Sequence, residues 1–392
     1  MHRRSTRNSN KRTIDDPRYK GLGNFGNTCY LNVIIQSLKS LSLFKDYCSS
    51  PTFINMYLIK NDNSVKDFDN SVTFNFHRIF TAMETVKKNM LPDTLRNILR
   101  TKDEMFVTDE QQDAHEAFML ILEIMHNEVS QRVTLTPTSD NEQLLQTCKS
   151  FFEPSYSPIY DMFYGIMITS RTCTQCNHIR YIYEPNSCIG LDIPVQELED
   201  IADYTKYLNI KCKFPQIKLS QEEMFLMSQH LSKETREAIR NHEIVKNEMV
   251  QTVTVDTCFD HMSKAEIIEG VNCSYCNHVC NSTCTYSVAV APKIMIAQVK
   301  RFKYGQPKNC TGIKIQHDIS VNTMNGPVRY KLKTLVNHVG ADAHFGHYYI
   351  TTFSHDLQSW VNINDGCVGL CDENTISTTD IYLMIYEKVL VM

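Results

Sequence analysis

Hydrophobic residues recur at helical spacing in two stretches of the first third of the chain. The first stretch contains Leu31, Ile34, Ile35, Leu38 and Leu41. This spacing predicts a helix that begins at or just after Cys29. The second stretch contains Ala114, Phe118, Ile121, Leu122 and Met125 as one apolar face. Thr108 and Gln111 stand at capping-box spacing before it, so we expect this second helix to open at Thr108.

The pattern changes after Phe151, where short alternating and aromatic runs typical of strands replace the helical spacing. Helices first and strands later indicate an α+β protein. Charged and amide residues dominate between about 195 and 250, and part of that stretch has a helical pattern. We interpret residues 195–250 as an insertion among the strands.

The segment GLGNFGNTCYLN at residues 21–32 places three glycines and three asparagines around Cys29. A structural cysteine behaves as a small hydrophobe and prefers apolar neighbours, so this setting favours a presented thiol rather than a buried one. A thiol at the start of a helix has its pKa lowered by the helix dipole and the unpaired amides. Cys29 is therefore a candidate nucleophile.

A cysteine nucleophile needs a base and a group that orients the base. The run HFGHYYITTF contains His347, and WVNIN follows after a polar turn, so the two runs predict a β-hairpin. A register that pairs His347 with Asn364 centres the turn in the polar segment and puts both side chains on one face. Asp365 is the competing orienter, although in a regular strand it points to the opposite face.

Two short segments repeat one pattern, CTQCNH at residues 173–178 and CSYCNH at residues 273–278. Two Cys-x-x-Cys turns predict a structural zinc site whose ligands are Cys173, Cys176, Cys273 and Cys276. The local segment CSYCNHVCNSTC, which adds Cys280 and Cys284, is an alternative metal site. Packed free thiols are the second alternative.

Composition and charge limit the classes of protein to which this chain can belong. The chain has 392 residues, a formal net charge of −4 and 15 cysteines. The near-neutral charge gives no support for a nucleic-acid partner, and the absence of a long apolar run gives none for a membrane. The start lacks the apolar core of a secretory signal, so we expect an intracellular protein of the cytoplasm or nucleus with reduced cysteines. Residues 1–18 are expected to form a basic, disordered tail.

With these residues identified, the chain resembles the ubiquitin-specific protease (USP) family of cysteine deubiquitinases. The resemblance rests on GLGNFGNTCYLN, EQQDAHEAF, HVGADAHFGHYYI and WVNIND, in that order. Supporting matches are FYGIMITSRTCTQC, LDIP, EIIEGVNCSYC, QVKRF, YKLKTLVNHVG and IYLMIYE. It implies a catalytic domain over residues 19–392 with a papain-like core, a helical thumb, a β-rich palm and zinc-binding β fingers that contain the insertion.

Carried over by position, the resemblance implies Cys29 as nucleophile, His347 as base and Asn364 as its orienter. Asp365, the competing orienter, stays a further catalytic candidate. It also implies that Asn24 donates to the oxyanion. Asp113 matches an acidic position that holds the basic tail of ubiquitin, and we expect Gln112, Gly346 and Tyr348 to bind substrate beside it.

The implied activity is hydrolysis of the bond after the terminal glycine of ubiquitin, with ubiquitin and ubiquitinated proteins as partners. Three alternatives remain at this point: a protease for another ubiquitin-like modifier, a ubiquitin-binding scaffold without turnover, and a zinc-knuckle nucleic-acid protein. Ala117, which stands where the family usually has phenylalanine, is one departure from the family pattern, and the added Cys280 and Cys284 are another.

Overall fold

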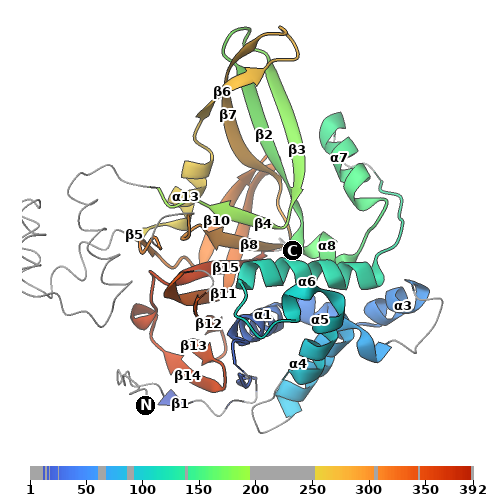
Figure 1. The fold of residues 1–392 in the computed structure, drawn as a ribbon, viewed down its shortest axis with the longest axis vertical. Coiled ribbons are helices and arrows are strands. Elements are labelled where there is room, and N and C mark those ends of the chain that lie inside the picture. Colours follow the sequence, from blue (N-terminus) through green and yellow to red (C-terminus); the bar gives the residue numbers. More distant parts are fainter. Residues whose placement is uncertain are drawn as a thin grey trace, which may run out of the picture. The chain divides into compact units, whose positions relative to one another are not determined.

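The computed structural model describes residues 12–13, 16, 18–24, 26–60, 68–85, 92–136, 140–194, 252–303, 308–342 and 345–389. The chain divides into two compact units, which are described separately (Figure 1). Unit 1 comprises Met1–Ser130, Lys333–Asn337 and His347–Ile376, and unit 2 comprises Gln131–Leu332, His338–Gly346 and Ser377–Met392. The predicted insertion at residues 195–250 lies outside the described residues.

Helices form most of unit 1. They are α1 (Cys29–Ser40), α2 (Ser42–Cys48), α3 (Pro51–Lys60), α4 (Val72–Thr85), α5 (Asp93–Lys102) and α6 (Ala114–Val129), with short 3₁₀ turns η1 (Phe68–Asn70), η2 (Glu104–Phe106) and η3 (Glu373–Thr375). Every residue of α1 from Cys29 to Leu38 is buried, and α1 packs against α2 and α6. A helix buried all round is the centre of its domain, so α1 is a rigid support for Cys29.

The second helix begins later than the sequence pattern predicts. The start expected at Thr108 is wrong, because α6 begins at Ala114 and Asp113 is its N-cap. The Asp113 carboxylate accepts hydrogen bonds from the backbone N–H groups of His115 (2.7 Å) and Glu116 (3.3 Å). Asp113 thereby satisfies two of the amides that a helix start leaves unpaired, which the Thr108 hydroxyl does not do.

Unit 1 also contains an antiparallel sheet in the order β1 (Arg12–Thr13), β14 (Cys367–Cys371), β13 (Ser359–Asn364) and β12 (Phe345–Ser354), of which Phe345 and Gly346 belong to unit 2. The hairpin of β12 and β13 is present as predicted, but its expected register is wrong. That register pairs Ile350 with Val361, whereas Ile350 pairs with Ile363. The shift is two residues, so each side chain stays on its predicted face.

Unit 2 is rich in β-strands. One group contains β2 (Gly165–Cys173), β3 (Ile179–Asn186), β6 (Glu266–Asn272), β7 (Val279–Val290), β10 (Asp318–Thr323) and part of β11 (Gly326–Asp342). A second contains β4 (Cys188–Leu191), β8 (Ile294–Val299) and β15 (Ile381–Lys388), and a third β5 (Thr252–Val253) and β9 (Gly312–Ile313). The helices of this unit among the described residues are α7 (Glu142–Phe152), α8 (Pro158–Phe163) and α13 (Val255–Met262). Figure 1 shows β2, β3 and β7 as long neighbouring strands, and the shorter β6 pairs with β7.

The arginine of the QVKRF segment has a structural part in unit 2. Arg301 is 1% exposed, and its guanidinium donates to the backbone oxygens of Ile381, Asn309, Thr311 and Thr378. Burial lowers the pKa of Arg301 to about 10. Because this buried guanidinium donates to four carbonyls, it holds several segments of the chain together at one point.

The predicted tail at residues 1–18 is only partly described. Within it, Arg12 and Thr13 form β1 against Leu370 and Gly369 of β14. This pairing concerns Arg12 and Thr13 alone, and the basic, disordered tail expected over residues 1–18 stays a prediction.

Candidate active site

Cys29 is the first residue of α1 and is only 2% exposed. The expectation of a presented thiol is therefore wrong for this conformation. Thr28 beside it is equally buried. The turn-forming residues before Cys29 shape the loop and do not expose the sulfur.

His347 on β12 forms hydrogen bonds with both the Cys29 thiol and the Asn364 side-chain amide. Its side chain forms a hydrogen bond with Cys29, and its Nε2 lies 2.7 Å from Oδ1 of Asn364. Since Nε2 faces Asn364, the nitrogen left for Cys29 is Nδ1. The Cys29 contact, with smaller contributions from Asn364 and Asp365, raises the pKa of His347 to about 9 against the lowering effect of burial. At neutral pH the imidazole therefore holds a proton beside the sulfur.

Asn364 reaches His347 even though the two are not directly opposite. With the observed register they are offset by two residues on one face, a diagonal that long side chains can span. Asn364 is also the last residue of β13 and pairs with Cys367 across a two-residue turn. Asp365, the first residue of that turn, has a φ of 47°, so the strand bends there.

The bend brings Asp365 back toward the site. Its Oδ2 lies 3.8 Å from Nε2 of His347. The opposite orientation expected for a regular strand does not apply, because the left-handed backbone at Asp365 interrupts the alternation of the strand. Asp365 therefore adds negative charge on the side of His347 away from Cys29.

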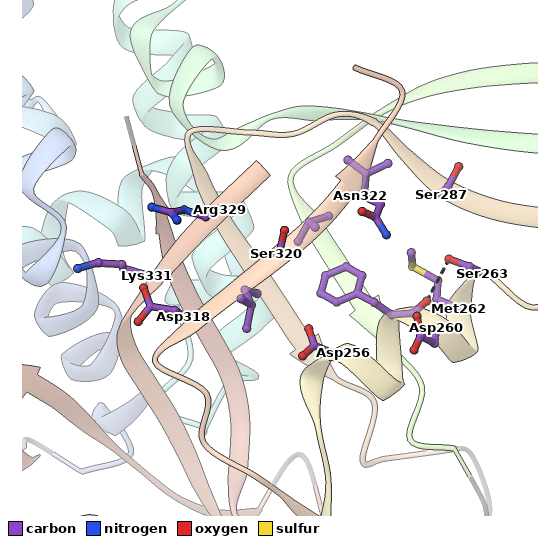
Figure 2. Close-up of a pocket in the computed structure, with 14 residues that line it drawn as sticks. Asp256, Asp260, Met262, Ser263, Ser287, Asp318, Ser320, Asn322, Arg329 and Lys331 are labelled. Atoms are coloured by element: carbon purple, nitrogen blue, oxygen red, sulfur yellow. Dashed lines mark hydrogen bonds between the residues drawn. The ribbon is translucent and has the colours of Figure 1, made fainter. Parts of the chain in front are cut away.

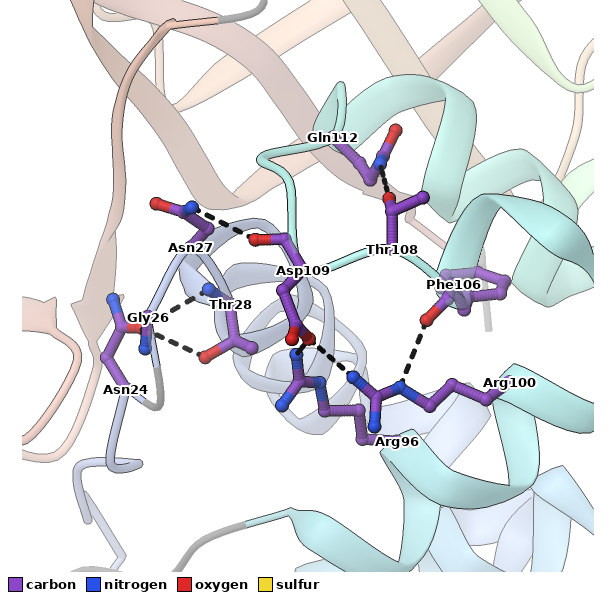
Figure 3. A network of polar contacts seen from close by, with 10 residues as sticks. All are labelled: Asn24, Gly26, Asn27, Thr28, Arg96, Arg100, Phe106, Thr108, Asp109 and Gln112. Carbon is purple, nitrogen blue, oxygen red and sulfur yellow. Dashed lines mark hydrogen bonds and ion pairs between the residues drawn. The ribbon is translucent and has the colours of Figure 1, made fainter.

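Asn24 is held at both ends of its amide. Its Nδ2 donates to Oδ2 of Asp365 (2.9 Å). Its Oδ1 accepts from the backbone N–H groups of Gly26 (3.0 Å) and Thr28 (3.2 Å) and from the Thr28 hydroxyl (3.0 Å), as Figure 3 displays from close by. These contacts fix which end of the amide donates. The amide nitrogen carries two hydrogens, and only one of them is used by Asp365.

Sequence reasoning missed three residues that support this site. Asn32 Nδ2 donates to Asp365 Oδ1 (2.8 Å), and Gln36 Nε2 donates to the Lys20 carbonyl (2.7 Å). Gly21 has no room for a side chain, because an added Cβ would lie 2.6 Å from Gly366 Cα. The signal for Asn32 and Gln36 was present, since both are polar positions three and seven residues after Cys29 in an otherwise apolar helix.

A polar network holds the other side of the Cys29 loop (Figure 3). Nδ2 of Asn27 donates to the Asp109 carbonyl (3.0 Å), and the Asp109 carboxylate accepts from Arg96 and Arg100 of α5. Asn27 has a φ of 56°, a left-handed conformation that asparagine tolerates well. The loop is thus tied to Asp109 on one side and, through Asn24, to Asp365 on the other.

The four predicted substrate-binding residues have different surroundings. Asp113 caps α6, and Gln112 donates to the Thr108 hydroxyl (3.1 Å). Gly346 is exposed, and an added Cβ would lie 2.5 Å from the Val339 carbonyl, so glycine is required there. Tyr348 is fully buried at the Ala114 backbone N–H, and burial raises its pKa. In this conformation Tyr348 offers no surface to a substrate.

Four cysteines meet in unit 2. The sulfurs of Cys173, Cys176, Cys273 and Cys276 all lie within 4.8 Å of one another. The two turns are alike, because Asn177 and Asn277 each have a φ of 56°. In each turn the asparagine N–H donates to the carbonyl of the first cysteine, at 2.9 and 2.8 Å. The paired set is therefore assembled by the fold itself.

This donor set fits a zinc ion, since four thiolates at such spacing match its tetrahedral preference. Within the described part of the chain, the local alternative does not form a comparable cluster. Cys284 is fully buried on β7, opposite Arg171. Cys280 is closer, with its Sγ 3.2 Å from that of Cys173.

A cavity of about 810 Å³ lies between α13 and the strands β10 and β11 of unit 2. Figure 2 shows Asp260 and Met262 on α13, with Ser320 and Asn322 on β10 across from them. No cysteine or histidine lines it, and none of the predicted site residues does. This cavity therefore shares no lining residue with the Cys29 site.

Comparison with known proteins identifies the family. The family model described as ubiquitin carboxyl-terminal hydrolase matches residues 20–386, so the chain belongs to this family. Ubiquitin carboxyl-terminal hydrolase 2 of Homo sapiens is 23% identical over 391 residues, covering 94% of this chain and 54% of that protein. Ubiquitin carboxyl-terminal hydrolase 21 of Homo sapiens is 22% identical over 402 residues, covering 94% and 61%. The chain thus spans little more than half the length of these curated relatives.

Solved structures show the same fold. The SAGA Ubp8/Sgf11/Sus1/Sgf73 DUB module bound to ubiquitin aldehyde matches with a TM-score of 0.63 and 18% identity, over 97% of this chain and 72% of that one. The predicted α+β class with the USP catalytic-domain fold is therefore confirmed. No helix among the described residues is long and apolar enough to cross a membrane.

Proposed function

We propose that the protein is a deubiquitinase that hydrolyses the peptide or isopeptide bond after the C-terminal glycine of ubiquitin. The observation that carries this proposal is the contact chain from Cys29 through His347 to Asn364. Family membership supports the substrate, since the matching relatives are named ubiquitin carboxyl-terminal hydrolases. The solved neighbour is a module bound to ubiquitin aldehyde.

In this proposal the Cys29 sulfur attacks the glycine carbonyl carbon. His347 lies in hydrogen-bond contact with this sulfur and takes up the proton that the sulfur gives up on attack. Asn364 accepts from Nε2–H of His347, which leaves Nδ1–H to protonate the leaving amine. Cleavage of the C–N bond yields a thioester on Cys29. Water, deprotonated by His347, then attacks the thioester, and the ubiquitin carboxylate leaves.

The oxyanion of each tetrahedral intermediate needs preorganised donors. The two donors we assign are the second Nδ2 hydrogen of Asn24, which has no acceptor among the described residues, and the backbone N–H of Cys29 at the start of α1. The Asp365 carboxylate accepts a hydrogen bond from Asn24 and so positions this donor. The same carboxylate lies close to Nε2 of His347 and favours its protonated form. We assign Gln112, Asp113, Gly346 and the backbone near Tyr348 to the C-terminal tail of ubiquitin.

The test is hydrolysis of ubiquitin that carries a fluorogenic amine on its C-terminal glycine. Steady release of the fluorophore by the purified full chain supports the proposal. Parallel substrates built on other ubiquitin-like modifiers distinguish a protease for one of those. Binding of ubiquitin without turnover would favour the scaffold alternative and contradict the proposal.

We further propose that Cys173, Cys176, Cys273 and Cys276 hold one structural zinc ion. Zinc neutralises the thiolates and links the end of the β2–β3 hairpin to that of the β6–β7 hairpin. The support is the convergence of four sulfurs on two identical turns. We also propose a catalytic domain over residues 19–392, an insertion at 195–250 and an intracellular location in the cytoplasm or nucleus.

Zinc content is expected to be one ion per chain and to fall below a tenth of that in Cys173→Ser, because the variant lacks one of the four assigned thiolate ligands. Elemental analysis of the purified protein measures this. Cys367→Ser, at an exposed cysteine outside the cluster, is the matched control and should keep its zinc. Full zinc in Cys173→Ser, or loss of zinc in Cys280→Ser, would contradict the assigned ligands.

Asp365→Ala is expected to lower kcat by about 10²-fold with little change in KM, because removing one preorganised oxyanion donor costs about this much. The carboxylate holds both Asn24 and Asn32, so the donor loses its fixed orientation. Steady-state kinetics on the fluorogenic substrate measure the effect. Asn24→Ala should cause a similar loss, and the double variant should cause little more. Fully additive losses would show that the two residues act independently.

A further inference from the structure

In addition to the cavity of unit 2, a cavity with a polar wall lies in unit 1, beside the C-terminal end of α1. Its volume is about 360 Å³, and it is lined by residues of α1, α2, the β12–β13 hairpin and β11. The cations on its wall are Arg18, Lys39, Lys45 and Lys333. The carboxylates on its wall are Glu84 and Asp356. The wall is therefore richer in positive than in negative charge.

The carboxylates near this cavity already have cationic partners. Arg18 pairs with Asp16 (2.7 Å) and with Asp356. Lys45 pairs with Glu84 (2.5 Å). No carboxylate of the wall is therefore left to neutralise a further ammonium group.

Lys39 has no ion-pair partner among the described residues. Its Nζ donates to the Arg18 carbonyl, and no carboxylate oxygen lies within ion-pair distance of it there. The side chain is largely buried, and burial lowers the pKa of Lys39 to about 8. A cation removed from water gains strongly from a bound anion, because its hydration has been lost.

The rest of the wall suits an anion with several acceptor oxygens. Ser42 and Ser354 line the cavity, and their hydroxyls donate no hydrogen bond within the described structure. Ile350, Phe353 and Ile363 add an apolar side. The volume is on the order of ten water molecules, so it accommodates a phosphate group with a small organic body.

We propose that this cavity, the Lys39 cavity, binds a phosphate group, free or as a monoester, with Lys39 as its central cation. Phosphate is close to a dianion at neutral pH and offers three strong acceptor oxygens, which matches several donors better than a planar carboxylate. The apolar side would receive the organic part of a monoester. The proposal concerns binding and does not rest on the proposed hydrolysis.

The position of the cavity connects a bound anion to the Cys29 site through shared structural elements. Lys39 and Cys29 lie ten residues apart on α1, which is about 15 Å along the helix axis. The hairpin that lines the cavity also carries His347 and Asn364. An anion bound there joins the helix that carries the thiol to the hairpin that carries the imidazole.

The test is calorimetric titration of the full chain with phenyl phosphate in a chloride buffer. We expect one saturable site whose affinity falls at least tenfold in Lys39→Gln and stays within threefold in Lys39→Arg. Lys331→Gln, at an exposed lysine on β11 outside this cavity, is the matched control and should bind as the wild type does. Inorganic phosphate serves as the second ligand, and phenol as the uncharged one.

A measurement on the unmodified chain guards against misfolding of the variant. Mild acetylation followed by mass spectrometry should find Lys39 protected at least fivefold by phenyl phosphate and Lys331 unprotected. Equal affinity for both phosphates assigns free phosphate as the ligand, and tighter binding of the ester assigns a monoester. Absence of saturable binding, phenol binding as tightly as phenyl phosphate, or no protection of Lys39 would each overturn the proposal.

Discussion

Cys29→Ala is expected to lower kcat/KM for the fluorogenic ubiquitin substrate by at least about 10⁴-fold, because the thioester route requires this sulfur and no other group replaces it. Cys29 is buried at the start of a helix that is buried from Cys29 to Leu38, so removal of one sulfur atom leaves the surrounding backbone supported. The loss should therefore appear in kcat, with folding intact.

Steady-state kinetics and ubiquitin affinity together measure this effect. Cys367→Ala is the matched control, since Cys367 is exposed on β14 and lies outside the contact chain. It should leave kcat/KM within twofold of the wild type. Activity retained in Cys29→Ala would show that another group carries the reaction.

His347→Gln is expected to lower kcat by about 10³-fold or more, since the variant loses both the base beside the Cys29 sulfur and the proton donor to the amine. Glutamine can still reach Asn364 but cannot hold a titratable proton. His355→Gln, at an exposed histidine in the turn of the same hairpin, is the control and should keep near-normal turnover. A His347→Gln variant with undiminished kcat would exclude His347 as the base.

The raised pKa of His347, about 9, sets the direction of two pH effects. The native state binds this proton more tightly than the unfolded chain, so the stabilisation is fully present below pH about 6.5 and is lost as pH rises through about 9. Turnover should decline over the same upper range, because the protonated imidazole is needed. Denaturant midpoints at pH 6 and pH 10 should differ less in His347→Gln than in the wild type. Equal differences would contradict this source of the shift.

Residues close in sequence were predictable, because local patterns determine them. The run of apolar positions after Cys29 predicted α1, and the polar turn between two β-branched runs predicted the hairpin that carries His347 and Asn364. The repeated Cys-x-x-Cys-Asn-His pattern predicted two like turns, and tertiary folding brings their sulfurs together.

The errors arose where tertiary contacts decide between local options. Both Thr108 and Asp113 could cap the start of α6. Asp113 is the N-cap because its carboxylate accepts hydrogen bonds from two backbone amides. The left-handed backbone at Asp365 bends the strand end, which alternation alone does not reveal. Cys29 is buried, and its hydrogen-bond partner His347 on β12 lies more than three hundred residues away in sequence.

Some features had no sequence signal at all. Asp365 binds Asn24 and Asn32 at once, and this depends on the meeting of a loop, a helix and a hairpin turn. The Lys39 cavity has the same origin, because the partners of Arg18 and Lys45 are scattered along the chain. Such sites emerge only when the three-dimensional arrangement is known.

The role of Cys29 as nucleophile can be tested by a reaction with ubiquitin that bears an electrophile in place of its C-terminal carboxylate. We expect one covalent adduct per chain, located on Cys29 by mass spectrometry and absent in Cys29→Ser. Folded protein that forms no adduct, or an adduct on a different residue, would contradict the assignment of Cys29 as the nucleophile of a deubiquitinase.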